Sequence, residues 1–385
     1  MEKIRLGIIG VGNMGTSHCR NILEGKCPEV ELAAVADINP DRIAWANENL
    51  PESVKKFNTA EELLDCGEID SILVAVPHYD HPTFAMEGFK RGLHVMIEKP
   101  AGVYTKQVRE MNEAAAKSNV TFGLMFNQRT NHIYRKMREI VQGGEYGEII
   151  RTNWIVTDWY RTQSYYDSGA WRATWSGEGG GVLLNQCPHQ LDLWQWICGM
   201  PVKVSTQMYF GKWHDIEVED DVSTFVEYAN GATGTFITST GDGFGTNRFE
   251  ILLDRARLIA ENNKLYFWEL DKSIRDYTKT ATEGFAKIDA TLIEPETDGK
   301  NEQHVGVLNA FAANILRGEP LIAGGEEGIN GLTLSNAMHL SAWTGGPVEL
   351  PLDEELYYNE LMKRVATSRR KVESKAVFAD TSGTY

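Results

Sequence analysis

Three polar residues that could do acid–base chemistry follow a run of glycines in the second half of the chain. Asn185, His189 and Asp192 come after Gly179–Gly181, and their i, i+4, i+7 spacing places them on one face of a helix predicted to end at Gly199. The glycines would let a ligand approach the backbone closely. Such a face could form an active-site wall, although a helix with one hydrogen-bonded core histidine fits the same pattern.

A second glycine pattern, Gly10-x-Gly12-x-x-Gly15, lies near the start of the chain. It follows the apolar run Ile4–Ile9, opens a helical pattern, and precedes a second apolar run that ends at Asp37. In this context Gly10 permits a tight turn, Gly12 lets the backbone approach a pyrophosphate, and Gly15 allows close helix–strand packing. The pattern predicts a dinucleotide site at a helix N-terminus. The alternative is a glycine-rich turn without a ligand.

The acidic residue Asp37 indicates which dinucleotide this site would bind. Its carboxylate would accept hydrogen bonds from the adenosine ribose hydroxyls and repel a 2′-phosphate, so NAD is favoured over NADP. Arg42 follows closely enough in sequence to leave NADP open.

Lys99 ends another predicted strand, in the element Glu98-Lys99-Pro100. Ligands bind at the carboxyl ends of strands in sheets of this kind, so Lys99 could reach into the crevice; a solvated surface lysine is the alternative. Pro100 stops the strand. The residues predicted to bind the cofactor are Gly10, Gly12, Asn13, Met14, Gly15, Asp37, Pro77, His81, Glu98, Lys99 and Asn127.

A loop from Tyr160 to Arg172 is rich in aromatic and arginine residues and ends in Ala170-Trp171-Arg172. Aromatic faces beside arginines suit stacking on sugar rings, although hydrophobic anchoring of the loop fits equally well. The run His214–Asp221 is acidic but lacks the glycine and the spacing of a calcium loop. We interpret it as a solvated edge and predict no metal site.

Length and composition indicate an ordinary two-domain globular protein. The chain has 385 residues and a net charge of −16, which argues against nucleic acid or an anionic membrane as a main partner. Its five cysteines form no C-x-x-C pair, and neither a signal peptide nor a membrane-spanning run is seen, so a reduced, cytoplasmic protein is expected.

Strand and helix patterns divide the chain near residue 145. Residues 1–145 alternate strands and helices, which predicts an α/β doubly wound parallel sheet. Residues 146–385 carry long β-type runs, which predict an α+β domain with a large, mostly antiparallel sheet. A charged helix from Glu354 to about Ser374, followed by a tail, is expected within residues 353–385.

These motifs together resemble the Gfo/Idh/MocA family of oxidoreductases, named after glucose–fructose oxidoreductase, inositol dehydrogenase and a rhizopine-catabolism protein. The resemblance rests on the glycine pattern, Val35-Ala36-Asp37, Pro77…His81, Glu98-Lys99-Pro100, and Gly179-Gly180-Gly181…His189-x-x-Asp192. It implies an N-terminal Rossmann domain and pyridine-nucleotide-dependent oxidation or reduction of a sugar or cyclitol hydroxyl. It also implies a homodimer or homotetramer formed through the C-terminal sheet.

The resemblance assigns the catalytic roles to Lys99 and His189, with Asp192 lining the substrate side. One position departs from the pattern, because many sugar and inositol dehydrogenases of the family carry aspartate where this chain has Asn185. An amide can orient a histidine but cannot stabilise an imidazolium by charge. The residues expected to bind substrate are Lys99, Tyr160, Trp171, Arg172, Asn185, His189 and Asp192.

The expected activity is therefore oxidation of a secondary ring hydroxyl by hydride transfer to NAD. The substrate class is a sugar, a glycoside (position 3 favoured) or a cyclitol. His189 is the first choice of base, with Lys99 hydrogen-bonding the same oxygen, and the two roles could be exchanged if burial lowers the pKa of the lysine. One alternative is a glycoside hydrolase or lyase that retains NAD and uses transient oxidation and elimination; Tyr160, Tyr165 and Tyr166 are candidates for its additional acid or base. A regulator that binds NAD without catalysis is a third.

Overall fold

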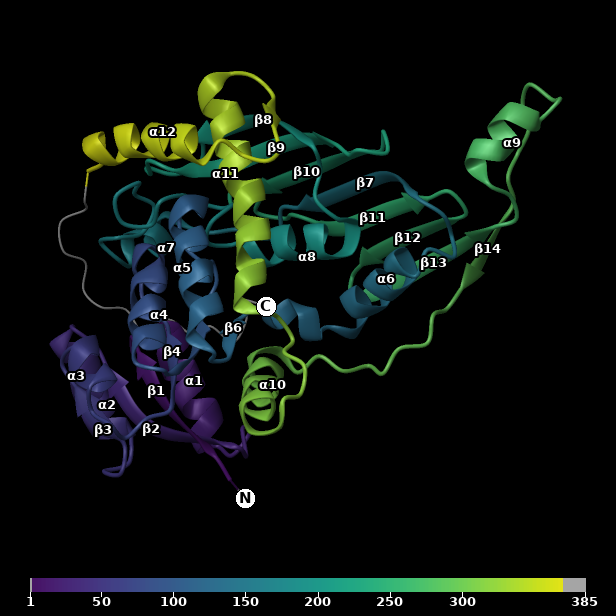
Figure 1. Ribbon diagram of the computed structural model, residues 1–385. Helices are drawn as coiled ribbons and strands as arrows, with labels where there is room; N and C mark the ends of the chain where they lie inside the picture. Colours follow the sequence, from purple (N-terminus) through teal and green to yellow (C-terminus); the bar gives the residue numbers. More distant parts are fainter. Residues whose placement is uncertain (1, 370–385) are drawn as a thin grey trace.

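The computed structural model describes residues 2–369 and begins with a six-stranded parallel sheet in the order β3-β2-β1-β4-β5-β6 (Figure 1). The strands are β1 (Ile4–Ile9), β2 (Val30–Ala36), β3 (Lys55–Phe57), β4 (Ser71–Val74), β5 (His94–Ile97) and β6 (Phe122–Leu124). The strand order reverses between β1 and β4. Ligands bind at such a switch point, beyond the carboxyl ends of the strands.

Alternate residues of these strands pack into two cores on opposite faces of the sheet. On one face, Leu6 and Ile8 pack with α1 (Asn13–Leu23), α2 (Pro40–Asn49) and α10 (Gln303–Arg317). On the other face, Ile9 packs with α3 (Ala60–Leu64), α4 (His81–Lys90) and α5 (Thr105–Ser118). The first sheet is therefore covered on both faces. The division near residue 145 stays a prediction, and α10 returns to this sheet from far along the chain.

The second sheet has nine strands in the order β14-β13-β12-β11-β7-β10-β9-β8-β15, and its pairs are antiparallel except β7 with β10. The strands are β7 (Ile149–Val156), β8 (Lys203–Phe210), β9 (Glu219–Glu227), β10 (Thr233–Ser239), β11 (Asn247–Leu253), β12 (Ala256–Glu261), β13 (Lys264–Leu270), β14 (Ala290–Ile293) and β15 (Val348–Glu349). The predicted fold class, a doubly wound parallel sheet followed by a mostly antiparallel one, is confirmed.

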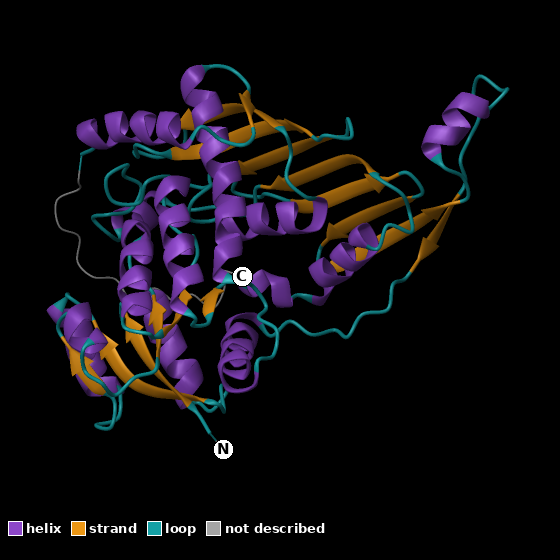
Figure 2. Cartoon of the chain, viewed as in Figure 1, coloured by secondary structure: helices purple, strands orange, loops and turns teal. Residues whose placement is uncertain are grey.

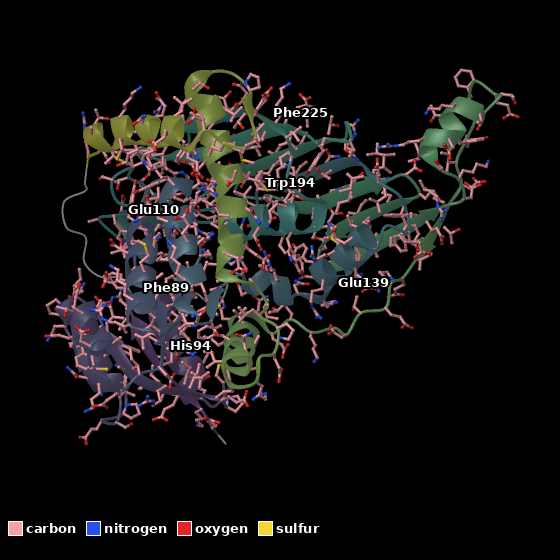
Figure 3. All side chains as sticks on the ribbon, in the orientation of Figure 1. Phe89, His94, Glu110, Glu139, Trp194 and Phe225 are labelled. Carbon is pink, nitrogen blue, oxygen red and sulfur yellow. The ribbon has the colours of Figure 1, made fainter. Side chains whose placement is uncertain are left out.

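Helices cover one face of the second sheet and leave the other face open (Figure 2). The covering helices are α6 (His132–Gln142), α8 (Pro188–Cys198) and α11 (Gly328–Thr344). Trp194 of α8 stacks on Phe236 of the sheet, whereas Phe225 of β9 points to the open face and is 41% exposed (Figure 3). The remaining helical segments are α7 (Gln163–Asp167), α9 (Ile274–Thr280), α12 (Glu354–Thr367) and the short η1 (His78–Asp80), η2 (Asn127–Thr130) and η3 (Gly325–Glu327).

Three sequence predictions differ from the structure. The helix after the glycine run begins at Pro188, so Asn185 lies in the preceding loop and does not share a helix face with His189. The run His214–Asp221 is not a solvated edge, because Glu219 and Asp220 are fully buried. Helix α12 ends at Thr367, and the predicted continuation to Ser374 and the tail reach residues outside the described range. Within residues 2–369, no helix is long and apolar enough to cross a membrane.

Candidate functional site

The loop between β1 and α1 has the geometry that its glycine pattern predicts. Gly10 has φ +95°, and a Cβ there would lie 2.4 Å from the Ala75 carbonyl oxygen. A Cβ at Gly15 would lie 1.9 Å from the Gly10 carbonyl oxygen, so the helix packs directly on the turn. At Gly12 a Cβ would meet no atom within 4 Å. Since α1 begins at Asn13 and Met14, an open space lies at a helix N-terminus, as a pyrophosphate requires.

Asp37 lies beside this loop at the end of β2. Its Oδ2 accepts a hydrogen bond from the Val11 backbone N–H at 2.7 Å, and its Oδ1 accepts one from the Asn39 N–H at 2.8 Å. The side chain is half-buried, so part of the carboxylate faces outward. Burial lowers the pKa of Arg42, and the charges of Asp37 and Asp41 oppose this effect.

Lys99 lies at the end of β5, before the cis peptide bond to Pro100. Its Nζ donates a hydrogen bond to the Asn185 backbone oxygen at 2.9 Å, which joins the two halves of the chain at this point. Burial lowers the pKa of Lys99; the charge of Glu98 opposes this shift and that of Arg172 adds to it. The lowered pKa favours the neutral amine, so Lys99 can exchange a proton with a nearby oxygen as well as donate a hydrogen bond to it.

His189 is the second residue of α8 and is 2% exposed. Its ring meets the edge of Phe126 at a centroid distance of 6.2 Å. Burial, followed by the charges of Lys99 and His304, holds the pKa of His189 well below 6.5. The structure therefore brings Lys99 and His189 together and keeps the imidazole neutral, which is the form that a general base needs.

Glu178, which the sequence analysis did not single out, is a buried carboxylate next to these groups. Its Oε1 accepts a hydrogen bond from the Asn185 side-chain amide, and its Oε2 accepts one from the Ala173 N–H at 2.6 Å. Burial raises the pKa of Glu178, and the charge of Arg172 opposes the rise. Its position directly before the glycine run was the available signal. Glu178 therefore supplies a carboxylate that is hydrogen-bonded to Asn185, the residue that stands where many family members have aspartate.

The predicted substrate loop reaches this cluster through Tyr165 and Arg172. The Arg172 guanidinium donates to the Tyr165 hydroxyl at 2.9 Å, and that hydroxyl donates to the Asn185 Oδ1 at 3.3 Å. Tyr160 is 50% exposed and does not take part in these hydrogen bonds. Tyr166 is buried and donates to the Thr240 hydroxyl at 2.9 Å. Of the three tyrosines considered in the sequence, Tyr165 is the one that joins the cluster.

Asp192 is fully buried and forms an ion pair within the protein. Its two carboxylate oxygens accept hydrogen bonds from Nε and a terminal nitrogen of Arg129, at 2.8 and 2.7 Å, and both side chains are about 1% exposed. Arg129 also pairs with Glu327 of η3 at 2.8 Å. Because both oxygens of Asp192 accept from a buried arginine, this side chain ties α8 to η2, and its predicted contact with substrate stays a prediction.

Several residues predicted to bind the cofactor hold the loops of the site. Both ring nitrogens of His81 lie 2.7 Å from backbone carbonyls, of Pro100 and Val76, so His81 ties the end of β4 to the end of β5. Pro77 begins the turn between them. Asn127 is buried and donates to the Gln303 side chain at 2.5 Å.

Glu98 belongs to a buried polar cluster under Lys99. Its Oε1 lies 2.6 Å from Nε2 of His18 in α1, and the His18 ring packs edge-on against His304 of α10. Burial opposes ionisation of Glu98, but the hydrogen bond and charge of His18 outweigh it and lower the pKa of Glu98 to about 2. This cluster fixes the backbone from which Lys99 projects. The local sequence pattern had not indicated His18 or His304.

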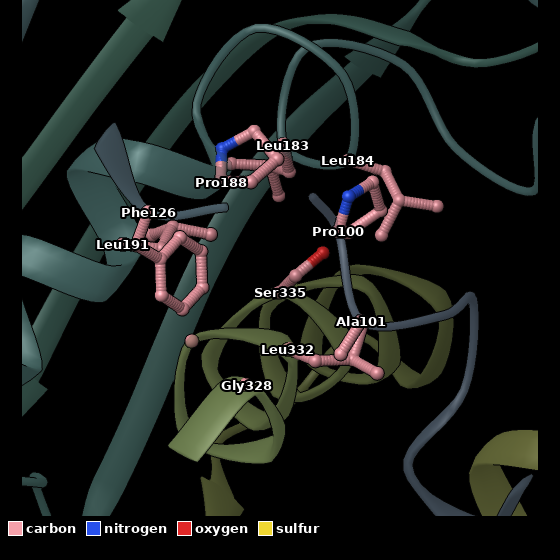
Figure 4. Close-up of a pocket in the computed structure, with 11 residues that line it drawn as sticks. Pro100, Ala101, Phe126, Leu183, Leu184, Pro188, Leu191, Gly328, Leu332 and Ser335 are labelled. Carbon is pink, nitrogen blue, oxygen red and sulfur yellow. The ribbon is translucent and has the colours of Figure 1, made fainter. Parts of the chain in front are cut away.

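A small apolar hollow, with room for little more than a water molecule, lies behind this site, between the Pro100–Ala101 turn, the start of α8 and α11 (Figure 4). Its lining includes Phe126, Leu184 and Leu332, with Ser335 as its polar side chain. Because its walls carry no charged side chain, it offers few hydrogen-bonding groups to a polyhydroxylated ligand. We therefore place the substrate site on the other side of the Pro100–Ala101 turn, where Lys99 lies. Among the residues that the structure describes, no group of three or more His, Cys, Asp or Glu side chains could hold a metal ion.

Comparison with known proteins defines the class to which this fold and site belong. The model described as an oxidoreductase family with an NAD-binding Rossmann fold matches residues 4–126, and the GFO/IDH/MocA C-terminal domain matches residues 134–259. The protein is therefore an oxidoreductase that depends on a pyridine nucleotide. It belongs to the GFO/IDH/MocA family, and the resemblance found in the sequence is confirmed.

Individual relatives agree with this assignment. The chain is 24% identical to myo-inositol 2-dehydrogenase of Thermotoga maritima over 87% of this chain and 95% of that protein. It is 29% identical to the rhizopine catabolism protein MocA of Rhizobium meliloti, over 52% of this chain and 58% of that protein. The WlbA dehydrogenase of Chromobacterium violaceum, solved with NADH and UDP-GlcNAcA, superposes with a TM-score of 0.79 at 27% identity, covering 92% of this chain and 97% of that one.

Proposed function

We propose that this protein is an NAD-dependent dehydrogenase that oxidises a secondary ring hydroxyl of a sugar, a glycoside (position 3 favoured) or a cyclitol. The observation that carries the proposal is the meeting of Lys99 and the His189 segment at the carboxyl edge of the first sheet, where Lys99 contacts Asn185. Relatives named myo-inositol 2-dehydrogenase and levoglucosan dehydrogenase support the substrate class.

The residues of the first domain fit an NAD molecule, since Gly12 leaves an open space at the N-terminus of α1. The pyrophosphate would lie against Gly12, Asn13 and Met14, and the adenosine ribose against Asp37, whose charge favours NAD over NADP. When bound, the nicotinamide ring accepts the hydride that leaves the carbinol carbon.

The proton of the reacting hydroxyl is taken up by a side chain of this protein. Neutral His189 removes the proton of the reacting hydroxyl, while the Lys99 ammonium hydrogen-bonds the same oxygen and stabilises its growing negative charge. Asn185, Tyr165 and Arg172 position the sugar from the other domain, and Trp171 provides an aromatic face. Because the pKa of His189 is lowered, the base stays unprotonated in moderately acidic solution, so the acid limb of kcat/KM should lie below pH 6.5.

One experiment tests the reaction and the role of Lys99 together. Absorbance of reduced nicotinamide is followed with excess NAD across a panel of sugars, cyclitols and glycosides. Lys99→Ala should lower kcat by about 10³-fold while changing the dissociation constant of NAD less than about twofold. Lys90→Ala, an exposed lysine of α4, is the matched control. Loss of NAD affinity in Lys99→Ala would contradict the catalytic assignment.

Tyr165 favours a second candidate, a glycoside hydrolase or lyase that retains NAD. Its hydroxyl lies beside Asn185 and Arg172, where it could protonate a leaving group after transient oxidation. Release of an aglycone from the glycosides of the panel, without growth of NADH absorbance, would select this reaction over net oxidation.

The open face of the second sheet supports a homodimer or homotetramer. Its outward side chains include large apolar residues such as Phe225 and Tyr209. Light scattering of the purified protein tests this proposal, which fails if the protein is monomeric.

A further inference from the structure

His78 is a buried histidine that no step of the proposed reaction uses. It begins η1, directly after Pro77 and just beyond the carboxyl end of β4, at the sheet edge that carries Lys99. Its ring meets the edge of Trp171 at a centroid distance of 5.6 Å. His78 therefore lies between the first sheet and the predicted substrate loop.

The hydrogen bond of His78 determines which ring nitrogen carries the hydrogen. Nδ1 lies 3.2 Å from the Glu178 backbone oxygen, and a carbonyl oxygen accepts hydrogen bonds but does not donate them. Nδ1 therefore carries the hydrogen, and Nε2 holds the lone pair of a neutral imidazole. Within residues 2–369, the Glu178 carbonyl is the single hydrogen-bond partner of His78.

The surroundings keep His78 neutral. Its environment contains His81 of α4, Lys99 after β5, Arg172 of the substrate loop and the Glu178 carbonyl. Burial, and then the charges of His81 and Lys99, hold the pKa of His78 well below 6.5. Lys99 and Arg172 can donate hydrogen bonds but cannot accept them. The acceptor oxygens of Glu178 and Asn185 beside them already accept hydrogen bonds within the protein, so Nε2 is an acceptor that a sugar hydroxyl could use.

We propose that Nε2 of His78 accepts a hydrogen bond from a hydroxyl of the substrate, which makes His78 a specificity-determining residue of this site. The proposal rests on the proposed oxidation of a polyhydroxylated ring. It requires that the substrate carry a hydroxyl that donates to Nε2. A substrate analogue in which this hydroxyl is removed or O-methylated would lose the contact.

Two substitutions test the roles of the two ring nitrogens of His78 separately. His78→Asn keeps an amide nitrogen near Nδ1, which can still donate to Glu178, but it removes the acceptor at Nε2. His78→Gln places an amide oxygen near Nε2 and loses the donor at Nδ1. We expect KM for the best sugar of the panel to rise about tenfold or more in His78→Asn and about threefold in His78→Gln, with the dissociation constant of NAD within about twofold in both.

The matched control is His94→Asn. His94 is the first residue of β5 and lies at the end of that strand away from Lys99. The reverse ranking, with His78→Asn close to wild type and His78→Gln impaired, would overturn the inference, since it would assign His78 only the bond to Glu178. Weaker NAD binding in both variants would overturn it in favour of a cofactor contact. If the wild type reduces NAD and His78→Asn has the same KM, this inference alone fails. Absence of NAD reduction with every panel member overturns the proposed function as well.

Discussion

The chain contains two glycine-rich stretches, and they differ in what approaches their backbones. At Gly12 in the first stretch, a Cβ would have no neighbour within 4 Å. In the second stretch a Cβ at Gly179 would lie 2.2 Å from the Val103 side chain, and one at Gly181 would lie 2.0 Å from the Glu219 carbonyl oxygen. The first stretch leaves room for a ligand at Gly12, whereas protein atoms lie against Gly179 and Gly181 of the second. The expectation that a ligand approaches Gly179–Gly181 is therefore corrected.

Each stretch is also held by a carboxylate, and these two carboxylates differ in burial. Asp37 is half-buried and accepts the Val11 N–H. Glu219 is fully buried; its Oε1 accepts the N–H groups of Gly181 and Leu183 at 2.8 and 3.0 Å. Its Oε2 lies 2.9 Å from Nε2 of His339. The comparison teaches that a glycine run indicates close approach of other atoms to its backbone. The sequence alone does not say whether these atoms belong to a ligand or to another segment of the protein; the fold determines this.

The largest effect is expected at the buried carboxylate. Glu219→Ala leaves two backbone N–H groups unsatisfied in the core and should lower the free energy of unfolding by about 4 kcal/mol. Glu219→Gln keeps an acceptor oxygen of the same shape and is the matched control, expected to lose much less. Urea unfolding followed by circular dichroism measures both. Equal stability of Glu219→Ala and wild type would show that this carboxylate does not hold the second stretch.

A smaller loss is expected from filling the second stretch. Gly181→Ala forces a methyl group against the Glu219 carbonyl and should cost about 3 kcal/mol of unfolding free energy. Gly243→Ala, where a Cβ meets nothing within 4 Å, is the control and should change stability by less than about 0.5 kcal/mol. If both variants unfold at the same urea concentration, the contrast in packing has no energetic consequence.

In the first stretch, a glycine-to-alanine substitution should weaken NAD binding and leave the stability of the protein unchanged. Gly12→Ala meets no protein atom, so its unfolding curve should coincide with that of the wild type. The methyl group would occupy space needed by the pyrophosphate and should weaken NAD binding about tenfold, or about 1.4 kcal/mol. Calorimetric titration with NAD measures this. A destabilised Gly12→Ala with unchanged NAD affinity would remove the distinction between the two stretches.

The sequence predicts local features of this molecule better than contacts between distant segments. The parallel sheet, the turn at Gly10 and the strand that precedes Lys99 each follow from neighbouring residues, because strand burial and turn geometry are local. The ion pair between Arg129 and Asp192 joins residues 63 positions apart, and Glu178 meets His78 across 100 positions. No spacing rule connects such residues, so the sequence indicates neither the buried partner of Asp192 nor the contact between His78 and Glu178.

The smallest effect is expected at the half-buried carboxylate of the first stretch. Asp37→Asn keeps an oxygen that can accept the Val11 N–H but loses the acceptor of the Asn39 N–H, so the loop should remain in place and stability should fall by no more than about 1 kcal/mol. It removes the negative charge that would repel a 2′-phosphate, while Arg42 remains near the same corner. The ratio of kcat/KM for NADP to that for NAD should therefore rise about fivefold, or about 1 kcal/mol. Reduction of both nucleotides with one sugar substrate measures the ratio. An unchanged ratio would mean that Asp37, like Glu219, serves only to hold its glycine stretch, and the contrast between the two carboxylates would disappear.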